Sequence, residues 1–384
     1  MKHFFIKKEI TASLFIIILV LFSIVNCVYS LPIDMQEIES SINNSLLMKT
    51  SFIESYGFMQ SVLEKRELNN FEVLKDNNDM LYLTSHQFSL RNVSQMVSRM
   101  HRLKETVESN NGQLITLIPP DKILEKRDAS LDGYPYSYNN ETADAYKEGL
   151  KNISVLDYRD IFLEKGLTNS DVFFKTDHHW KIETAFQAFQ ELVDYLNKKD
   201  SLKLDPQYYY RDLNNYNQFL YKDSYIGSIG RKTGKLYGGV EDYTLIYPNF
   251  ETSFEYDMQH YGEKTHRAGR MDDTLINPHY FKIDRKDYLN PQYDFYSAYL
   301  DYNCSYAKIV NKNNPDGLKV VFYKDSYSMP LITFFSTVCS EIEIIDPRYY
   351  DKDINKYFEE NKFDYVFVSM SPDLLYEDSF IFYK

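Results

Sequence analysis

Glycine, proline and cysteine are scarce in this chain of 384 residues, which contains 13, 12 and 3 of them. So little glycine and proline excludes collagen-like and low-complexity proteins, which are rich in both. Three cysteines cannot supply the disulfide framework of a small secreted scaffold, and no Cys-x-x-Cys or Cys/His spacing indicates a zinc site. Cys304 and Cys339 lie in the predicted folded part. They fit either one disulfide bond or two buried thiols.

Positive charge is also in deficit, since the formal net charge is −13. Binding of nucleic acid depends on basic side chains that neutralise phosphates, so we expect no nucleic-acid partner. Hydrophobic residues make up 43% of the chain and charged residues 26%, which is typical of a folded protein with a sizeable core.

The N-terminus differs in composition from the rest. Lys2, Lys7 and Lys8 precede the apolar run "ITASLFIIILVLFSIVNCVYS" at 10–30. A basic flank before about 18–20 apolar residues predicts either a signal peptide, cleaved after Ser30, or a single membrane anchor. The positive charges are expected to stay in the cytoplasm, which places the remainder outside it. We therefore predict a leader or anchor at 1–30 and one extracytoplasmic domain at 31–384.

Hydrophobic spacing predicts alternating strands and helices along most of that domain. Apolar residues at helical spacing indicate helices, and short continuous apolar runs indicate buried strands. The predicted helices are 93–107, 182–196, 329–338 and 353–361, and the predicted strands are 113–120, 154–160, 171–176, 318–323, 341–346 and 364–370. This alternation predicts an α/β fold, a parallel sheet with helices on both faces. Residues 200–300 break the rhythm and are predicted to be an inserted loop region.

Two polar segments directly follow predicted strands. One contains Asp177, His178 and His179, and the other contains Ser326 in "KDSYS". In a sheet of this kind the ligand site lies outside the carboxyl ends of the strands. A serine at a strand-to-helix turn needs a base, and an imidazole base needs an orienting carboxylate. The sequence therefore predicts Ser326 as nucleophile, His179 as general base and acid, and Asp177 as the orienting residue.

Other interpretations of these segments remain open. An Asp-Ser pair before a helix also fits an ordinary helix N-cap. Aspartate and histidine are also ligands for divalent metals, as in phosphoesterases with a DHH motif. Asp121 and Asp346 would be the further ligands, but they have no recognisable metal spacing, so we predict no metal. His178 is expected to be a structural or supporting residue.

The motifs together resemble a known family. "TDHHWK" followed by a helix resembles the DHHW family of bacterial exported proteins, which resembles the alginate O-acetyltransferase branch of the SGNH-hydrolase-like fold. That branch has its Asp-x-His pair before the nucleophilic serine, which is the order of Asp177, His179 and Ser326 here. "LIPPDK", "KDSYS", "SYIGSIGRKTG" and "IIDPRYY" also resemble segments of these families.

The resemblance implies an exported, cofactor-free O-acyltransferase that moves acetyl groups onto an extracellular or cell-wall polysaccharide. A membrane-bound O-acyltransferase is the implied supplier of the acyl group. Gly227, Ser228, Gly230 and Arg231, in the exposed loop at 221–239, are the expected substrate-binding residues and candidate oxyanion donors. Three alternatives are a carbohydrate esterase with the same triad, a metal-dependent phosphoesterase and a non-catalytic glycan-binding surface protein.

Overall fold

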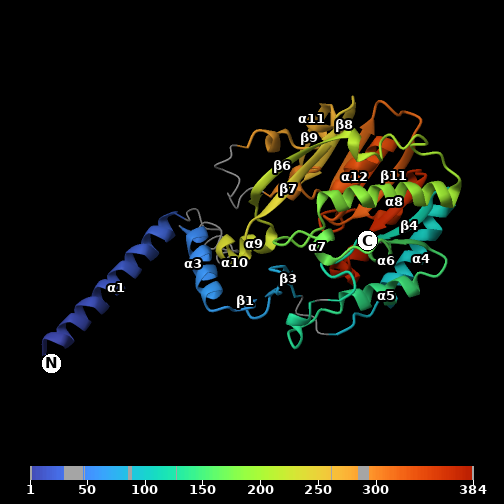
Figure 1. Ribbon diagram of the computed structural model, residues 1–384. Helices are drawn as coiled ribbons and strands as arrows, with labels where there is room; N and C mark the ends of the chain where they lie inside the picture. Colours follow the sequence, from blue (N-terminus) through green and yellow to red (C-terminus); the bar gives the residue numbers. More distant parts are fainter. Residues whose placement is uncertain are drawn as a thin grey trace.

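The computed structural model describes residues 2–29, 46, 48–84, 89–126, 128–260, 262–283 and 294–382. At its centre lies an eight-stranded sheet (Figure 1). Its order is β5 (Ser154–Asp157), β4 (Gln113–Ile118), β13 (Tyr365–Ser369), β11 (Leu318–Lys324), β12 (Cys339–Ile345), β10 (Tyr306–Asn311), β8 (Phe254–His260) and β9 (Glu263–Gly269). The five strands from β5 to β12 run parallel, as predicted.

The other end of the sheet corrects the prediction of a wholly parallel sheet. β10 pairs antiparallel with both β12 and β8, and β8 pairs antiparallel with β9. β8 and β9 form a hairpin, and two strands joined by a short turn can only run antiparallel. The region 200–300, predicted as an inserted loop region, therefore contributes two strands to the main sheet. It also contains a separate two-stranded antiparallel sheet of β6 (Tyr216–Tyr225) and β7 (Glu241–Pro248).

Helices cover both faces of the sheet, as the alternation predicted (Figure 1). Side chains along β11 alternate between two cores, because successive residues of a strand point to opposite faces. Val320 and Phe322 belong to the core that includes α8 (Ile182–Asp200) and α12 (Ser328–Phe335). Val321 and Tyr323 belong to the core that includes α4 (Ser94–Ser109) and α13 (Ile354–Glu360).

The helices α4 and α8 match the periodicity that predicted them. The buried residues of α4 are Met96, Met100, Leu103 and Val107, which recur every three or four positions on one face. The other helices are α1 (Lys2–Tyr29), α3 (Lys49–Val62), α5 (Asn139–Gly149), α6 (Tyr158–Glu164), α7 (Asn169–Val172), α9 (Ser228–Thr233), α10 (Lys235–Gly238) and α11 (Met271–Thr274). A small sheet is formed by β1 (Glu67–Leu68), β2 (Val73–Lys75) and β3 (Leu81–Leu83).

The predicted strand at 171–176 is wrong. Its first residues belong to the end of α7, and the chain then forms a loop that carries Asp177 and His179. The apolar run is nevertheless buried, since Val172, Phe173 and Phe174 all lie in the core. An apolar run of this length indicates burial more reliably than it indicates a strand.

The N-terminal helix α1 carries exposed apolar side chains, including Leu14, Ile17 and Leu21. Over the residues that are described, no helix meets the length and apolarity needed to cross a membrane, so the predicted membrane segment is not supported. The two cysteines of the folded part, Cys304 and Cys339, are buried free thiols, which decides between the two possibilities left open by the sequence.

Candidate active site

A loop between α7 and α8 closes on itself and presents Asp177. Phe173 and Trp180 pair as an isolated antiparallel bridge, and the Lys181 N–H donates to the Val172 carbonyl at 2.8 Å. The Phe174 N–H donates to the His179 carbonyl at 3.3 Å. We call residues 173–181 the catalytic loop. Because its two ends are tied together, the residues at its tip have fixed positions.

Two ionic side chains bind the backbone of the catalytic loop. Lys122 is 4% exposed, and its ammonium donates to the carbonyl oxygens of Phe174 at 2.5 Å, Lys175 at 3.0 Å and Asp177. The carboxylate of Glu241 accepts the N–H groups of Lys175 and Thr176, each at 2.7 Å. Buried backbone groups need such partners, and here two side chains provide what a neighbouring strand would otherwise provide.

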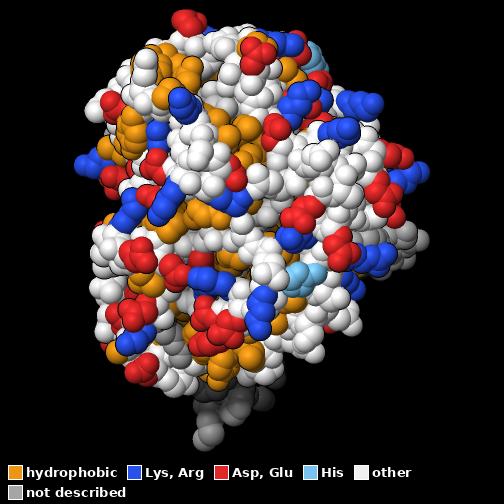
Figure 2. Space-filling view, turned by 90° about the vertical axis from the view of Figure 1, so that its right-hand side faces the viewer, with side chains coloured by type: hydrophobic (Ala, Val, Ile, Leu, Met, Phe, Trp, Pro, Cys, Tyr) orange, Lys and Arg blue, Asp and Glu red, His pale blue; other side chains and the backbone are white. Residues whose placement is uncertain are grey.

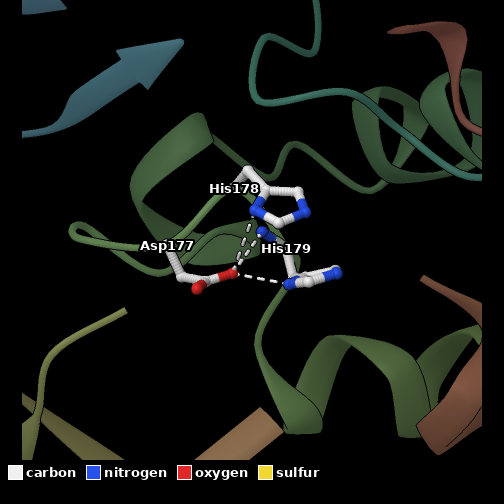
Figure 3. A group of neighbouring side chains, drawn as sticks. All are labelled: Asp177, His178 and His179. Carbon is white, nitrogen blue, oxygen red and sulfur yellow. Dashed lines mark hydrogen bonds and ion pairs between the residues drawn. The ribbon is translucent and has the colours of Figure 1, made fainter. Parts of the chain in front are cut away.

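The catalytic loop meets the turn that carries Ser326, which we call the nucleophile turn. Their side chains form one continuous hydrogen-bonded row of Asp177, His179 and Ser326. His179 Nδ1 lies 2.6 Å from Asp177 Oδ1, and His179 Nε2 lies 2.8 Å from Ser326 Oγ. Figure 3 shows the two histidine rings next to the Asp177 carboxylate. Asp177, His179 and Ser326 are 1%, 6% and 8% exposed, so all three residues are buried. The predicted residues are thus brought together, although 147 positions separate the histidine from the serine.

The nucleophile turn lies between β11 and α12, as predicted. The Asp325 carboxylate accepts the Tyr327 N–H at 2.9 Å and, through its other oxygen, the Ser371 N–H at 2.6 Å. These bonds tie the turn to the end of β13. Among the described hydrogen bonds, none uses the Ser326 N–H. This group is therefore available to stabilise an oxyanion at the serine.

The glycine-rich segment flagged in the sequence packs against the catalytic loop. The Ser228 N–H donates to Asp177 Oδ2 at 2.6 Å, and the Gly230 N–H donates to the Thr176 carbonyl at 2.8 Å. Arg231 forms an ion pair with Asp294 at 3.1 Å. In this structure the backbone of Gly227, Ser228 and Gly230 therefore contacts the loop that holds Asp177 and His179.

Aromatic residues that sequence reasoning missed surround the imidazole. Tyr296 stacks on the His179 ring, with centroids 3.7 Å apart and an interplanar angle of 8°. The indole N–H of Trp180 donates to the Tyr327 carbonyl at 3.0 Å, and the Tyr296 hydroxyl donates to the same oxygen at 2.9 Å. The Tyr327 hydroxyl in turn donates to the His178 carbonyl. Trp180 belongs to the "TDHHWK" motif quoted from the sequence, whereas no local pattern marked Tyr296.

The surroundings change the pKa values of Asp177 and His179. Burial alone would raise the pKa of Asp177, but the nearby His179 and His178 and the hydrogen bonds from His179 and the Ser228 N–H hold it well below its usual range. Burial lowers the pKa of His179 from its ordinary value of 6.5, and Asp177 offsets this only in part. At neutral pH the carboxylate is therefore charged and the imidazole neutral, which is the state of a general base.

Some of the residues considered as metal ligands lie close together, whereas Asp346 pairs with an arginine. The ligand atoms of Asp177, His178 and His179 all lie within 4.8 Å of one another, so this group could hold an ion. Both carboxylate oxygens of Asp177 already accept hydrogen bonds, from His179 and from the Ser228 N–H. Asp346 instead pairs with Arg348 through two hydrogen bonds of 2.9 and 2.7 Å.

Comparison with known proteins agrees with this architecture. Residues 78–216 match the family model described as the SGNH hydrolase-like domain of acetyltransferase AlgX. The predicted resemblance is confirmed. The match to this acetyltransferase domain includes Asp177 and His179 and ends before Ser326. No curated protein sequence matches the chain.

Two solved structures have a similar fold. PatB1 of Bacillus cereus, in a form with a sulfonyl adduct, aligns with a TM-score of 0.64 and 18% identity, over 81% of this chain and 100% of that one. A DHHW family protein from Eubacterium siraeum aligns with a TM-score of 0.60 and 17% identity, over 80% of this chain and 92% of that one. At these identities the alignments establish the fold alone.

Proposed function

We propose that this chain is an exported serine O-acyltransferase that transfers acetyl groups to an extracellular or cell-wall polysaccharide. The observation that carries the proposal is the row from Asp177 through His179 to Ser326, with hydrogen-bond distances of 2.6 and 2.8 Å. The match to the SGNH hydrolase-like acetyltransferase domain supports acetyl transfer. Export is supported by the basic and apolar N-terminus, and we infer a membrane-bound O-acyltransferase as the source of acyl groups.

The mechanism has two half-reactions. Ser326 Oγ attacks the carbonyl carbon of the acyl donor while its proton passes to His179 Nε2, and the Ser326 N–H faces the oxyanion that forms. The donor's leaving oxygen departs with the proton from His179, which leaves an acyl-enzyme on Ser326. A sugar hydroxyl then attacks this ester, gives its proton to His179, and the proton returns to Ser326 Oγ as the acetylated sugar leaves. Asp177 keeps the imidazole oriented throughout.

The arrangement of Asp177, His179 and Ser326 would serve an esterase equally well, since water can take the place of the sugar hydroxyl. The two activities differ only in which hydroxyl resolves the acyl-enzyme, and a transferase must exclude water from that step. A sugar acceptor that gains an acetyl group in the presence of the enzyme and an acetyl ester would establish transfer. Acetate release without any acetylated sugar would leave an esterase.

The first experiment follows acetate release from 4-nitrophenyl acetate by the full chain. We expect Ser326→Ala to abolish the release, and Ser109→Ala, at an exposed position at the end of α4, to retain it. Sulfonyl fluorides react with activated serine hydroxyls, so one should label wild type at Ser326 and leave Ser326→Ala unlabelled.

A chelator in the same assay tests the metal alternative that the Asp177, His178 and His179 group keeps open. A hydrolytic metal would activate water and would be lost to the chelator. Release that persists with the chelator and disappears in Ser326→Ala supports the serine mechanism. Release that disappears with the chelator and persists in Ser326→Ala would overturn it in favour of a metal site.

A further inference from the structure

Aromatic rings cover the two faces of the His179 imidazole. Tyr296 lies against one face, with ring centroids 3.7 Å apart and the two planes only 8° from parallel. The His178 ring contacts the imidazole as well, with centroids 3.8 Å apart and an interplanar angle of 37°. Two rings at these distances cannot share one face, so each takes its own. Neither contact has a part in the mechanism described so far.

The plane of a histidine ring depends on such contacts, because rotamer preference fixes its terminal torsion only weakly. The hydrogen bond between Nδ1 and Asp177 Oδ1 holds one side of the His179 ring. Nε2, which must take the proton of Ser326, lies on the other side, so a tilt of the plane moves it away from the hydroxyl oxygen at 2.8 Å. Misplacement of a catalytic group by about 1 Å can cost about 10²-fold in rate.

Tyr296 is itself held at both ends. It is 1% exposed, and its hydroxyl donates to the Tyr327 carbonyl at 2.9 Å. At the backbone, its N–H donates at 3.3 Å to the carboxylate of Asp294, which caps the short 3₁₀-helix Phe295–Ala298. The Tyr296 ring therefore has a fixed position from which it can hold the imidazole.

An ion pair anchors the residue that caps this helix. Asp294 Oδ2 lies 3.1 Å from a guanidinium nitrogen of Arg231, and the same guanidinium donates to the Ile226 carbonyl at 3.1 Å. Figure 2 shows Lys and Arg side chains interspersed with Asp and Glu over one face of the molecule, and exposed pairs of this kind contribute little to stability. The Arg231 side chain is only 21% exposed and has two partners. It therefore ties the helix of Tyr296 to α9.

We propose that Tyr296 is a positioning residue for the general base, and that Asp294 and Arg231 hold it in place. Its ring fixes the plane of the His179 imidazole, so that Nε2 stays aligned with Ser326 Oγ. This role rests on the proposed acyltransferase function. It also gives Arg231, which the sequence led us to expect as a substrate-binding residue, a part in supporting the base.

The test measures kcat and KM for acetate release from 4-nitrophenyl acetate by the full chain. Tyr296→Leu removes the stacked ring, and we expect kcat per folded molecule to fall by about 10- to 100-fold while KM changes little. Tyr296→Phe keeps the ring, and the Tyr327 carbonyl then still accepts the Trp180 N–H. The kcat of Tyr296→Phe should therefore stay close to that of wild type.

Tyr299→Leu is the matched control. Tyr299 is also fully buried and lies in the same segment, but its hydroxyl bonds to the Ile246 backbone and its ring packs on Phe334. The substitution should lower the free energy of unfolding in urea, while kcat per folded molecule stays near that of wild type. Equal losses of kcat in Tyr296→Leu and Tyr299→Leu would reduce Tyr296 to a packing residue and overturn the proposal.

The remaining outcomes also decide the question. Unchanged kcat in Tyr296→Leu, or a kcat in Tyr296→Phe as low as that in Tyr296→Leu, would contradict a role for the stacked ring. A rise in KM alone would assign Tyr296 to donor binding instead. If Tyr296→Leu does not fold, Asp294→Ala takes its place, because it removes the helix cap and leaves every ring intact. Its kcat should fall at unchanged KM, and a wild-type kcat would overturn the proposal.

The same assay separates this role from the proposed function. Acetate release that depends on Ser326 supports the function, whereas kcat in Tyr296→Leu relative to Tyr299→Leu reports the positioning role. Absence of release by wild type, or release that Ser326→Ala retains, would overturn the proposed function and the role of Tyr296 with it. Ser326-dependent release that Tyr296→Leu retains in full would overturn the role of Tyr296 alone.

Discussion

Gly227 and Asp177 pack so closely that position 227 has no room for a side chain. A Cβ on Gly227 would lie 2.3 Å from Asp177 Cβ and 2.6 Å from Asp177 Cα. The backbone at Gly227 has φ −70°, a value open to any residue, so space alone requires glycine here. The close approach brings the Ser228 N–H to Asp177 Oδ2, which fixes the carboxylate.

Gly227→Ala should therefore impair activity more than stability. The added methyl group must displace Asp177, and misplacement of a catalytic group by about 1 Å can cost about 10²-fold in rate. Overpacking of this kind costs about 1–3 kcal/mol of the free energy of unfolding. Acetate release and urea unfolding of the same preparation measure the two effects.

Gly149→Ala is the matched control for this prediction. Its Cβ would lie 2.6 Å from Val97 Cγ2, in a contact between α5 and α4. It should lower stability while the rate per folded molecule stays near that of wild type. Equal loss of rate in the two variants would contradict the role of Gly227 in positioning Asp177.

The pH dependence of kcat/KM should show an acidic limb with its midpoint below pH 6.5. In the proposed mechanism His179 acts as base only when neutral, and burial lowers its pKa from 6.5, so activity should rise as the pH passes upward through that lower value. Asp177 stays charged throughout, because its pKa lies well below its usual range. Acetate release measured between about pH 4 and 8 gives the midpoint. A midpoint at or above pH 6.5 would contradict the environment described for His179.

Substitutions within the triad should not be additive. Residues that act as one unit lose most of the rate when any one of them is removed. Asp177→Asn should lower kcat by as much as about 10⁴-fold, because the amide no longer orients the imidazole in the productive tautomer. His179→Ala and the double variant His179→Ala/Ser326→Ala should then be about equally inactive. A double variant far slower than either single variant would indicate independent roles.

Lys122→Met should destabilise the catalytic loop. It removes the donor of three carbonyl groups while keeping much of the buried volume, and each unsatisfied buried polar group costs about 1–3 kcal/mol. We expect a lower free energy of unfolding in urea and a lower kcat for acetate release. Lys126→Met, at an exposed position nearby, is the control and should match wild type in both. Full activity in Lys122→Met would show that the loop keeps its position without the ammonium.

Hydrophobic periodicity was sufficient to predict the helices that are amphipathic and the strands that are continuously apolar. α4 and α8 follow from side chains that recur on one helical face, and β4, β11 and β13 follow from buried runs between polar segments. The rule for carboxyl ends then correctly selected Ser326, which follows β11. It selected the Asp-x-His pair through a strand at 171–176 that does not form, and a loop after α7 carries that pair instead.

The features that the sequence did not predict share one physical reason. In each case, contacts with residues far along the chain decide the structure. Phe173 and Phe174 are apolar and buried like strand residues. Lys122, however, binds the Phe174 carbonyl, and Glu241 binds the N–H groups that follow it, which no local pattern reveals. Tyr296 similarly reaches His179 from a segment without regular periodicity. The antiparallel pairing of β10 also depends on partners far along the chain.

The way the catalytic loop is held determines when the site can form during folding. Its carbonyls depend on Lys122, about fifty positions earlier, and its amide groups depend on Glu241, more than sixty positions later. A folding chain cannot secure the loop until Glu241 has reached it, and cannot place Ser326 beside His179 until β11 has joined the sheet. Contacts of such long range form late, because loop closure must precede them. Ser326 therefore meets His179 only when the surrounding domain is nearly complete.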